Sequence, residues 1–306
     1  MDKTDLVLCQ LLLGNSRFSY RELADTLNLS VTAVHKRIQD LIASGVIRKF
    51  TAKLSLFQLG AVHVLVFGSS KLNSVQSLLG QFESNSLVYW LAVGGGNYLY
   101  VGAYLQSISE LEGLVNFVKE TAEIPEPTVG ITTSPMLRVA VPDAGKRTLY
   151  HLDYQIIRSL EENSRKATSE VAGELGVSAK TVRRRLAQMV KNSLVELSME
   201  WYPDASNDIL SVLHVSLKPD ADKNTLNVLC QKYAPNIVFY WGFSNIPALY
   251  IAIVWTSRVK DLQGIRENLE KEAGVQSVAP NIIYTGHIFK TWRDQLLEEK
   301  ATMSPS

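Results

Sequence analysis

The sequence contains few of the residues that mark secreted or membrane proteins. Its 306 residues include only two cysteines, Cys9 and Cys230. Two are too few for a disulfide framework, so both are expected to be packed thiols in a reducing compartment. No apolar run approaches the ~18 residues that a transmembrane helix needs, and the first residues do not have the pattern of a signal peptide. A cytoplasmic protein with no membrane partner is therefore predicted.

The chain also lacks a large excess of charge and a recognisable catalytic set. The formal net charge is +1, with 20% charged and 46% hydrophobic residues, as in ordinary soluble globular proteins. No Ser/His/Asp or Cys/His set and no cluster of metal ligands has the spacing that such chemistry requires. We therefore expect no enzymatic activity, no cofactor and no metal. Any nucleic-acid partner must be bound through local clustering of charge.

What the sequence does contain is an internal duplication. The segment SVTAVHKRI, which starts at Ser30, recurs as SAKTVRRRL at Ser178, 148 residues later. Asp5 and Asp153 keep the same offset upstream of it. A repeat of this length is a duplicated module rather than a solenoid unit of roughly 20–50 residues. Each half is thus expected to have the same fold and to supply one copy of the same site.

Each half begins with helices whose apolar residues recur at helical spacing. In the first half, Ser19 starts a predicted capping box and Ser30 is a predicted N-cap. In the second half, Thr168 and Ser178 are the predicted caps. Two short helices around a tight turn, with a strand pair after the later and longer one, are typical of a winged helix-turn-helix.

The remainder of each half alternates strands and helices in the order βαββαβ, which is the ferredoxin-like plan. Its two helices cover one face of the sheet, so the bare face must pack on another such domain, within the chain or in a second chain. The predicted fold class is α+β, with two winged helix-turn-helix domains alternating with two ferredoxin-like βαββαβ domains. The predicted bounds are 1–60 and 149–206 for the winged helices, 61–135 and 207–292 for the βαββαβ domains, 136–148 for a linker and 293–306 for a C-terminal tail.

This arrangement resembles the Lrp/AsnC (feast/famine) family of transcriptional regulators over essentially the whole chain, twice. The matching residues include Glu22-Leu23-Ala24, Leu29-Ser30 and Gly45-Val46-Ile47 in the first copy, and Glu170-Val171-Ala172 and Val177-Ser178 in the second. The resemblance implies a sequence-specific regulator that binds double-stranded DNA. It also implies βαββαβ domains that associate into a homo-oligomer and bind an amino acid or another metabolite as effector.

The helix that starts at Ser178 is the stronger candidate for DNA contact. From Lys180 to Lys191 it carries five cations and no carboxylate. Helices in the major groove use Arg and Lys for phosphates, and Arg or Gln for base edges. A solvated charged face is the alternative, and the position of this helix after the turn favours DNA. Its candidate residues are Lys180, Thr181, Arg183, Arg184, Arg185, Gln188 and Lys191.

The corresponding helix of the first half has a mixed outward face, in which Asp40 would oppose a phosphate. It either reads DNA with less electrostatic affinity or has a structural role. Arg48 and Lys49 in its wing are candidates for additional phosphate contacts. Arg37 and Arg185 lie nearer the buried edge, where an ion pair within the domain and a phosphate clamp are equally consistent. The candidates on this helix are Thr32, His35, Lys36, Arg37 and Gln39.

A glycine-rich connection is the candidate effector site. The family's signature, a Gly followed three residues later by Asp, corresponds here to segments that end in Asn97 and Asn245. Because Asn replaces Asp in both, a weak or altered response to amino acids is predicted. The candidate ligand residues are Gly94, Gly95, Gly96, Asn97, Gly242 and Asn245.

Two alternatives to a DNA-binding regulator stay open. His63 and His214 occupy equivalent strand positions and are expected to be packed histidines. Sirohaem decarboxylases resemble this family, so the two histidines also suggest a fused enzyme of that kind. The third possibility is a metabolite-sensing protein that no longer binds DNA.

Overall fold

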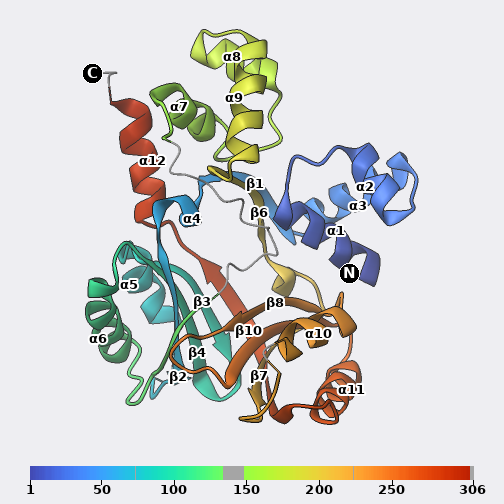
Figure 1. Cartoon of the computed structure of the whole chain (residues 1–306), viewed down its shortest axis with the longest axis vertical. Helices are drawn as coiled ribbons and strands as arrows, with labels where there is room; N and C mark the ends of the chain where they lie inside the picture. The colour runs from blue at the N-terminus through green and yellow to red at the C-terminus, as the bar shows by residue number, and fades with distance from the viewer. Residues whose placement is uncertain (73, 134–147, 223, 304–306) are drawn as a thin grey trace. The chain divides into compact units, whose positions relative to one another are not determined.

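The chain folds into two compact units, and a computed structural model describes residues 1–72, 74–133, 148–222 and 224–303 (Figure 1). The helical unit comprises Leu8–Ala61, Arg138–Tyr202 and Lys290–Ser306, and the sheet unit comprises Met1–Val7, Val62–Leu137 and Pro203–Phe289. Their elements confirm the predicted α+β class. Only the last residue of the predicted linker, 136–148, lies within the described part of the chain.

The helical unit contains two copies of a three-helix module, each followed by one strand. The first copy consists of α1 (Lys3–Gly14), of which Leu8–Gly14 belong to this unit, α2 (Tyr20–Leu27), α3 (Val31–Ala43), β1 (Ile47–Leu54) and the short α4 (Leu56–Leu59). The second consists of α7 (His151–Ser159), α8 (Thr168–Leu175), α9 (Ala179–Lys191) and β6 (Val195–Trp201), and α12 (Trp292–Thr302) is added to it.

Side-chain caps start three of these helices, α2, α3 and α9, where the sequence predicts. The Ser19 hydroxyl accepts a hydrogen bond from the Glu22 amide (3.2 Å), and the Glu22 carboxylate accepts one from the Ser19 amide (2.7 Å). This reciprocal pair confirms the capping box. Ser30 caps α3 at 3.1 Å. The predicted Thr168 cap is wrong, because Ala167 is the N-cap of α8 and no side chain bonds to the backbone there.

One ribbon of two strands is shared by the modules. The sequence predicts a strand pair within each half, and this prediction is wrong. Instead, β1 of the first half pairs with β6 of the second in antiparallel register, from Ile47 opposite Trp201 to Leu54 opposite Val195. Alternating apolar residues identify both strands, but they do not identify the partner of either. Each wing strand is therefore completed by the other half of the chain.

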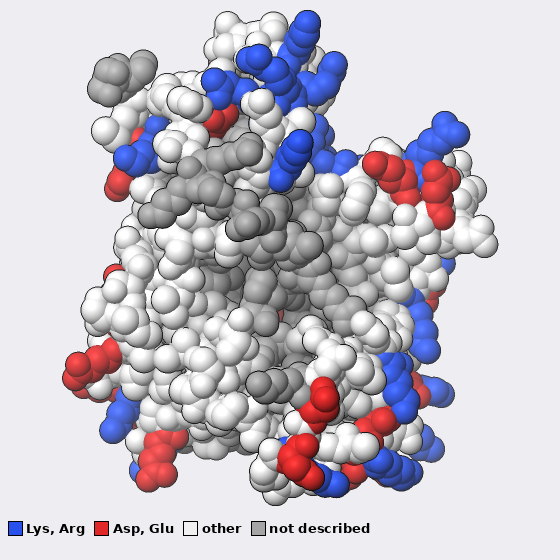
Figure 2. Space-filling view, in the orientation of Figure 1, with Lys and Arg blue, Asp and Glu red and all other residues white. Residues whose placement is uncertain are grey.

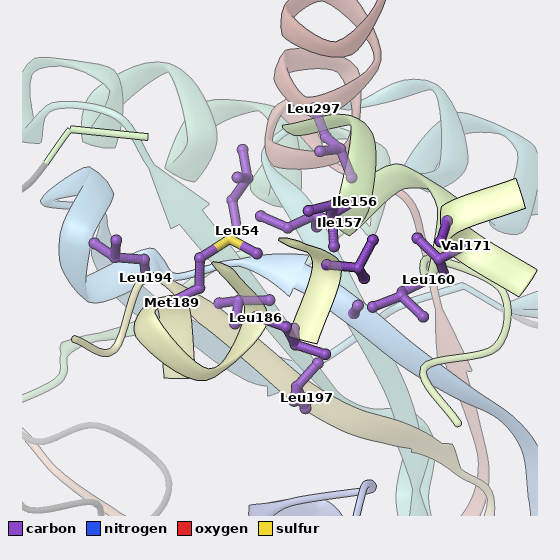
Figure 3. Close-up of a cluster of buried hydrophobic side chains, with 14 residues drawn as sticks. Leu54, Ile156, Ile157, Leu160, Val171, Leu186, Met189, Leu194, Leu197 and Leu297 are labelled. Atoms are coloured by element: carbon purple, nitrogen blue, oxygen red, sulfur yellow. The ribbon is translucent and has the colours of Figure 1, made fainter. Parts of the chain in front are cut away.

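The core of the second module includes side chains from the first half. Ala52 and Leu54 of β1 are buried against α7 and α9, in the same cluster as Ile156, Leu186 and Met189. Figure 3 shows Leu54 among these side chains. The second module consequently cannot close its core without the strand of the first.

At the C-terminal end, the sequence predicts a tail over 293–306, and the structure corrects this prediction. Trp292–Thr302 form the helix α12, whose Trp292, Leu297 and Ala301 are buried. Thr291 and Asp294 form its capping box. The segment is rich in charged residues, which obscure its apolar face in the sequence.

Two βαββαβ domains make up the sheet unit. The first consists of β2 (Val62–Ser69), η1 (Gln76–Leu78), α5 (Leu79–Ser84), β3 (Val88–Gly94), η2 (Gly95–Asn97), β4 (Tyr98–Leu105), η3 (Ile108–Glu110), α6 (Leu111–Thr121) and β5 (Thr128–Ile131). The second consists of η4 (Pro203–Ala205), β7 (Ile209–Leu217), α10 (Thr225–Lys232), β8 (Ile237–Gly242), β9 (Leu249–Thr256), α11 (Val259–Glu270) and β10 (Val275–Ile288). The strand orders β5-β2-β4-β3 and β10-β7-β9-β8 are those of the ferredoxin-like plan.

These two domains pair with each other within the chain. Beyond its own domain, β10 continues as Ile283–Ile288 and pairs with β3, which joins all eight strands into one sheet. Thr132 and Phe243 form an isolated bridge between the two ends of that sheet. A cluster that includes Phe67, Tyr100 and Trp241 is buried between the faces that the helices leave bare. Of the two predicted possibilities, pairing within one chain is the one observed.

Two histidines lie within this pairing. His63 Nε2 is 2.9 Å from the Tyr89 hydroxyl and its Nδ1 is 3.1 Å from the Thr132 hydroxyl. His214 Nε2 is 2.7 Å from the Tyr100 hydroxyl. Burial disfavours the charged imidazolium and lowers the pKa of His63 to about 3 and that of His214 to about 4. Both histidines are packed, as the sequence predicts, and both are neutral at pH 7.

We predict that the free energy of unfolding falls as the pH is lowered from 7 to 5. Since the folded-state pKa values of His63 and His214 lie below the unfolded value of ~6.5, the unfolded chain binds more protons in this range. Each histidine contributes a slope of at most ~1.4 kcal/mol per pH unit. Urea denaturation at several pH values should show a smaller slope for His214→Gln than for the wild type, and equal slopes would refute the assignment.

We also predict that Leu54→Ala lowers the free energy of unfolding by about 2–5 kcal/mol, because it leaves a cavity in a closed core. Leu54 is 1% exposed, whereas Phe57 on α4 is 53% exposed and provides the control, Phe57→Ala. Hydrogen exchange should locate the loss of protection in α9 of the other half. A Leu54→Ala variant as stable as Phe57→Ala would contradict the shared core.

Candidate nucleic-acid interface

The helix α9 presents a basic face to solvent. Val182, Leu186 and Met189 are buried, so they fix which side of the helix points inward. Lys and Arg side chains gather over α9, near the top of Figure 2. None of the outward cations forms an ion pair with any residue that the structure describes. The exposed candidates on this face are Lys180, Arg183, Arg184, Gln188 and Lys191.

Two of the predicted residues on α9 have internal partners. The Arg185 guanidinium donates to both oxygens of the Asp153 carboxylate, at 3.0 and 3.1 Å, and lies over the Tyr150 ring. Asp153 is only 5% exposed, so Arg185 holds α9 against α7. The sequence left two roles open for Arg185, an ion pair within the domain and a phosphate clamp, and the structure shows the ion pair. The Thr181 hydroxyl is 2.9 Å from that of Ser178 at the start of α9.

A mixed surface is found on α3 of the first module. Val34, Ile38 and Leu41 are buried, as their spacing predicts. The His35 ring packs against Tyr20 with 5.1 Å between centroids. Figure 2 shows acidic and basic side chains side by side over α2 and α3. The exposed polar residues on α3 are Thr32, His35, Lys36, Gln39 and Asp40, and Arg37 is half-buried.

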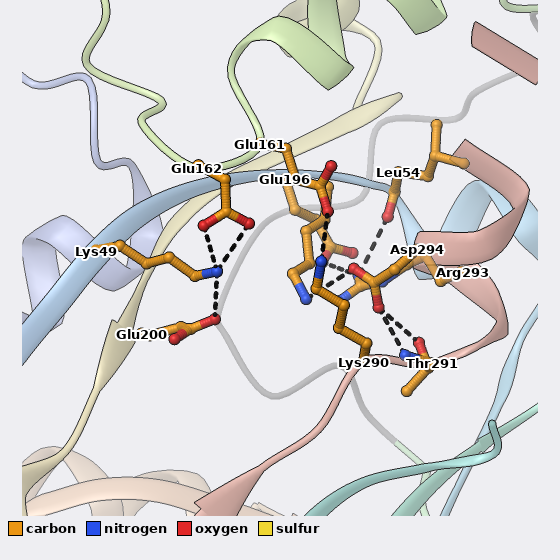
Figure 4. Close-up of polar contacts among 11 residues, drawn as sticks. Lys49, Leu54, Glu161, Glu162, Glu196, Glu200, Lys290, Thr291, Arg293 and Asp294 are labelled. Carbon is orange, nitrogen blue, oxygen red and sulfur yellow. Dashed lines mark hydrogen bonds and ion pairs between the residues drawn. The ribbon is translucent and has the colours of Figure 1, made fainter. Parts of the chain in front are cut away.

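The wing cations are engaged within the protein. Lys49 Nζ lies 2.7 Å from Glu162 and 3.3 Å from Glu200, as Figure 4 shows. Burial disfavours its charge, but the bond to Glu162 and the nearby carboxylates outweigh burial and raise the pKa of Lys49. The Arg48 guanidinium stacks on the Tyr202 ring at 3.4 Å. Lys49 is thus paired with carboxylates of the protein, whereas Arg48 is exposed and stays a predicted phosphate contact.

In the sheet unit, polar groups of the predicted effector connections are already hydrogen-bonded within the protein. The Gly95 amide donates to Asn281 Oδ1 at 2.7 Å, and a Cβ at Gly94 would lie 2.7 Å from that oxygen. Asn97 donates to the Leu72 carbonyl at 3.0 Å. The side-chain amide of Asn245 bonds to Ile131 N–H (2.9 Å) and the Val129 carbonyl (2.7 Å). Gly242 uses its carbonyl as the acceptor for Thr133 N–H (3.0 Å).

Sequence reasoning missed several residues that shape these sites. Asn281 lies on β10, 186 residues from the glycine that it contacts. Arg17 and Arg165 in the connections before α2 and α8 bond across the two modules. Arg17 and Arg165 are 148 residues apart, which is the offset of the duplicated segment, and this correspondence could have identified them from the sequence.

Two candidate features are absent from the part of the chain that the structure describes. It has no group of three His, Cys, Asp or Glu side chains that is arranged to hold a metal ion. Nor is any helix within these residues both long and apolar enough to cross a membrane.

Comparisons with known proteins agree with the two modules. Residues 1–48 match the winged helix-turn-helix DNA-binding family, and residues 151–190 match the AsnC-type helix-turn-helix domain. An uncharacterised helix-turn-helix-type transcriptional regulator of Pyrococcus abyssi is 32% identical over 119 residues, which are 38% of this chain and 80% of the relative. The transcriptional regulator LysM of Sulfurisphaera tokodaii is 41% identical over 56 residues, which are 18% of this chain and 40% of that protein.

One solved structure resembles the whole chain in fold. The siroheme decarboxylase NirDL is similar over 97% of both chains with a TM-score of 0.59, at 12% sequence identity. Identity this low supports a shared fold alone. Family membership rests on the sequence matches instead, which are to the AsnC-type domain and to a transcriptional regulator covered over 80% of its length. The chain belongs to the Lrp/AsnC family of helix-turn-helix transcriptional regulators.

Proposed function

We propose that this regulator binds double-stranded DNA through α3 and α9 and reads two half-sites of different sequence. The observation that carries the proposal is the outward face of α9, where exposed cations have no carboxylate partner among the described residues. Cations that lack a carboxylate partner, on a helix that follows a tight turn, are available to bind the phosphates of a polyanion such as DNA. The partly buried ion pair Arg185–Asp153 holds that helix in place instead of contacting the ligand.

The two helices offer different chemistry to DNA. On α9, Arg183 and Arg184 can pair with the O6 and N7 acceptors of guanine, and Lys180 can neutralise a phosphate. On α3, Thr32 and Gln39 offer neutral contacts and Lys36 is an exposed cation. Since each helix would face its own half-site, the preferred site is not a palindrome. The α9 half should supply most of the electrostatic affinity.

We propose that the chain has no catalytic activity, although its fold is similar to that of a siroheme decarboxylase. One solved structure of that enzyme is a complex with an iron-uroporphyrin III analogue. In this chain, the histidines that suggest such chemistry are His63 and His214. Tyrosine and threonine hydroxyls bond to their ring nitrogens, and aromatic rings surround them. Their engagement with neighbouring side chains favours a structural role in the pairing of the sheets.

We further propose that the response to α-amino acids is weak and that chains associate further. The Gly95 amide and the Asn245 side chain are already bonded, and Asn97 stands where the family has a carboxylate for an amino group. One chain already contains two paired βαββαβ domains. Light scattering of the purified protein tests the association, and a monomer at all concentrations would contradict it.

Arg184→Ala is predicted to weaken DNA binding by about 1–3 kcal/mol, and a lost phosphate contact reduces the salt slope by about one. Lys36→Ala, the matched change on α3, should cost less because its helix also exposes Asp40. Gel-shift titrations at several salt concentrations measure both effects. An equal loss for the two variants would refute the asymmetry.

A thermal-shift screen of common α-amino acids should give no strong stabilisation. A ligand at about 100 times its dissociation constant adds roughly 2.7 kcal/mol, which such a screen detects. A strong shift that disappears in Asn97→Ala but persists in Asn116→Ala, an exposed control on α6, would show that the site is functional.

A further inference from the structure

We propose that Arg17, Arg165, Ser16 and Ser164 form an interlock that fixes the separation of α3 and α9, so that the protein accepts one spacing between half-sites. The proposal rests on the proposed DNA-binding function and adds a determinant of specificity to it. The interlock residues are positioning residues, since they act through the recognition helices. Ser16 and Arg17 lie between α1 and α2, and Ser164 and Arg165 lie between α7 and α8.

Each of these connections bonds to the wing strand of the other module. The Ser16 amide donates to the Leu197 carbonyl of β6 at 3.0 Å. The Ser164 amide donates to the Phe50 carbonyl of β1, also at 3.0 Å. The two-stranded ribbon is thus flanked on both edges. A two-stranded ribbon is marginally stable by itself and twists easily, so these edge contacts restrict its movement.

The serine hydroxyls meet where the two connections approach each other. Ser16 Oγ and Ser164 Oγ are 2.6 Å apart, and both residues are 0% exposed. A buried hydroxyl without a partner is costly, so each serine satisfies the other only while the modules stay together. The pair is separated by 148 residues, the offset of the duplication.

The two arginines extend this contact reciprocally. Arg17 donates to the carbonyls of Ser164 and Lys166, the latter at 3.0 Å. Arg165 donates to the carbonyls of Ser16 at 2.5 Å and Phe18 at 3.0 Å. Each guanidinium therefore bridges two carbonyls of the opposite connection. A planar fork of donors restricts orientation as well as distance, which a lysine ammonium does less well.

The two arginines lie close together although their positive charges repel each other. Burial and the nearby charge of Arg165 lower the pKa of Arg17. Neither guanidinium forms an ion pair within the described residues. The carbonyl bonds compensate for the repulsion, together with the Tyr20 and Phe50 rings beneath Arg165. Such an arrangement suits one relative position of the modules and disfavours others.

The recognition helices follow the interlock closely along the chain. Tyr20 starts α2 and Thr168 starts α8, each within a few residues of its arginine. Tight turns at Asn28 and Gly176, both with left-handed backbone angles, then lead to α3 and α9. A displacement at the interlock consequently moves both helices relative to each other.

A distance measurement on the full chain tests the interlock without DNA. Spin labels at Asp25→Cys and Gly173→Cys, equivalent exposed positions on α2 and α8, report the separation of the modules. A side chain at position 173 meets nothing within 4 Å, and the native Cys9 and Cys230 are buried. We expect one narrow distance distribution, which broadens in Arg17→Ala and Arg165→Ala and stays narrow in Arg158→Ala. Arg158 pairs with Glu298 outside the interlock.

Duplexes with increasing insertions between the selected half-sites test the consequence for DNA. Inserting half a helical turn places the second half-site on the opposite face, so wild-type affinity should fall on the order of tenfold. Arg17→Ala should reduce that difference to about threefold or less while it keeps the affinity for an isolated α9 half-site. Arg17→Lys, which keeps the charge and most of the side-chain volume, should fall between the two.

The outcomes separate the two proposals. A narrow distance distribution in both alanine variants overturns the interlock, whatever the DNA results are. An equal loss at all spacings, with a smaller salt slope, would make Arg17 a phosphate contact and also overturn it. A wild-type protein that selects no duplex refutes the proposed function, while the distance distributions still decide whether the interlock exists.

Discussion

The antiparallel ladder between β1 and β6 is the contact on which the helical unit depends. It pairs a strand from each half of the duplicated chain over the full length of β1, from Ile47 to Leu54. The ladder brings Leu54 into the core of the second module and places the two connections before α2 and α8 at its edges. Because backbone bonds and buried apolar area both cross between the halves, neither module is an independent folding unit.

This constraint explains how the two modules could diverge without separating. The inward residues of α3 and α9 keep the same apolar pattern, since both helices must still pack into the unit. Their outward residues are free of that requirement, and there α9 carries arginines while α3 carries Asp40. In a homodimer the two recognition helices would be identical. A fused pair allows each helix to be adapted to a different half-site.

Local features of the fold were predictable from the sequence, and the pairings between distant segments were not. Ser19, Glu22 and Ser30 act within one helical turn, so their residue types were sufficient to place the helix starts. The partner of β1 could not be inferred, because alternation specifies a buried face but not which strand lies beside it. Asn281 and Gly95 are 186 residues apart, and nothing local to either predicts their bond. The interlock arginines lie in connections, where periodicity gives no information.

Selection of random duplexes by the purified full-length chain, followed by sequencing, tests the central claim most directly. The account predicts one enriched site with two dissimilar halves at a single spacing, with guanine favoured in the half that loses its preference in Arg184→Ala. A palindromic site, with both halves equally sensitive to that substitution, would contradict it.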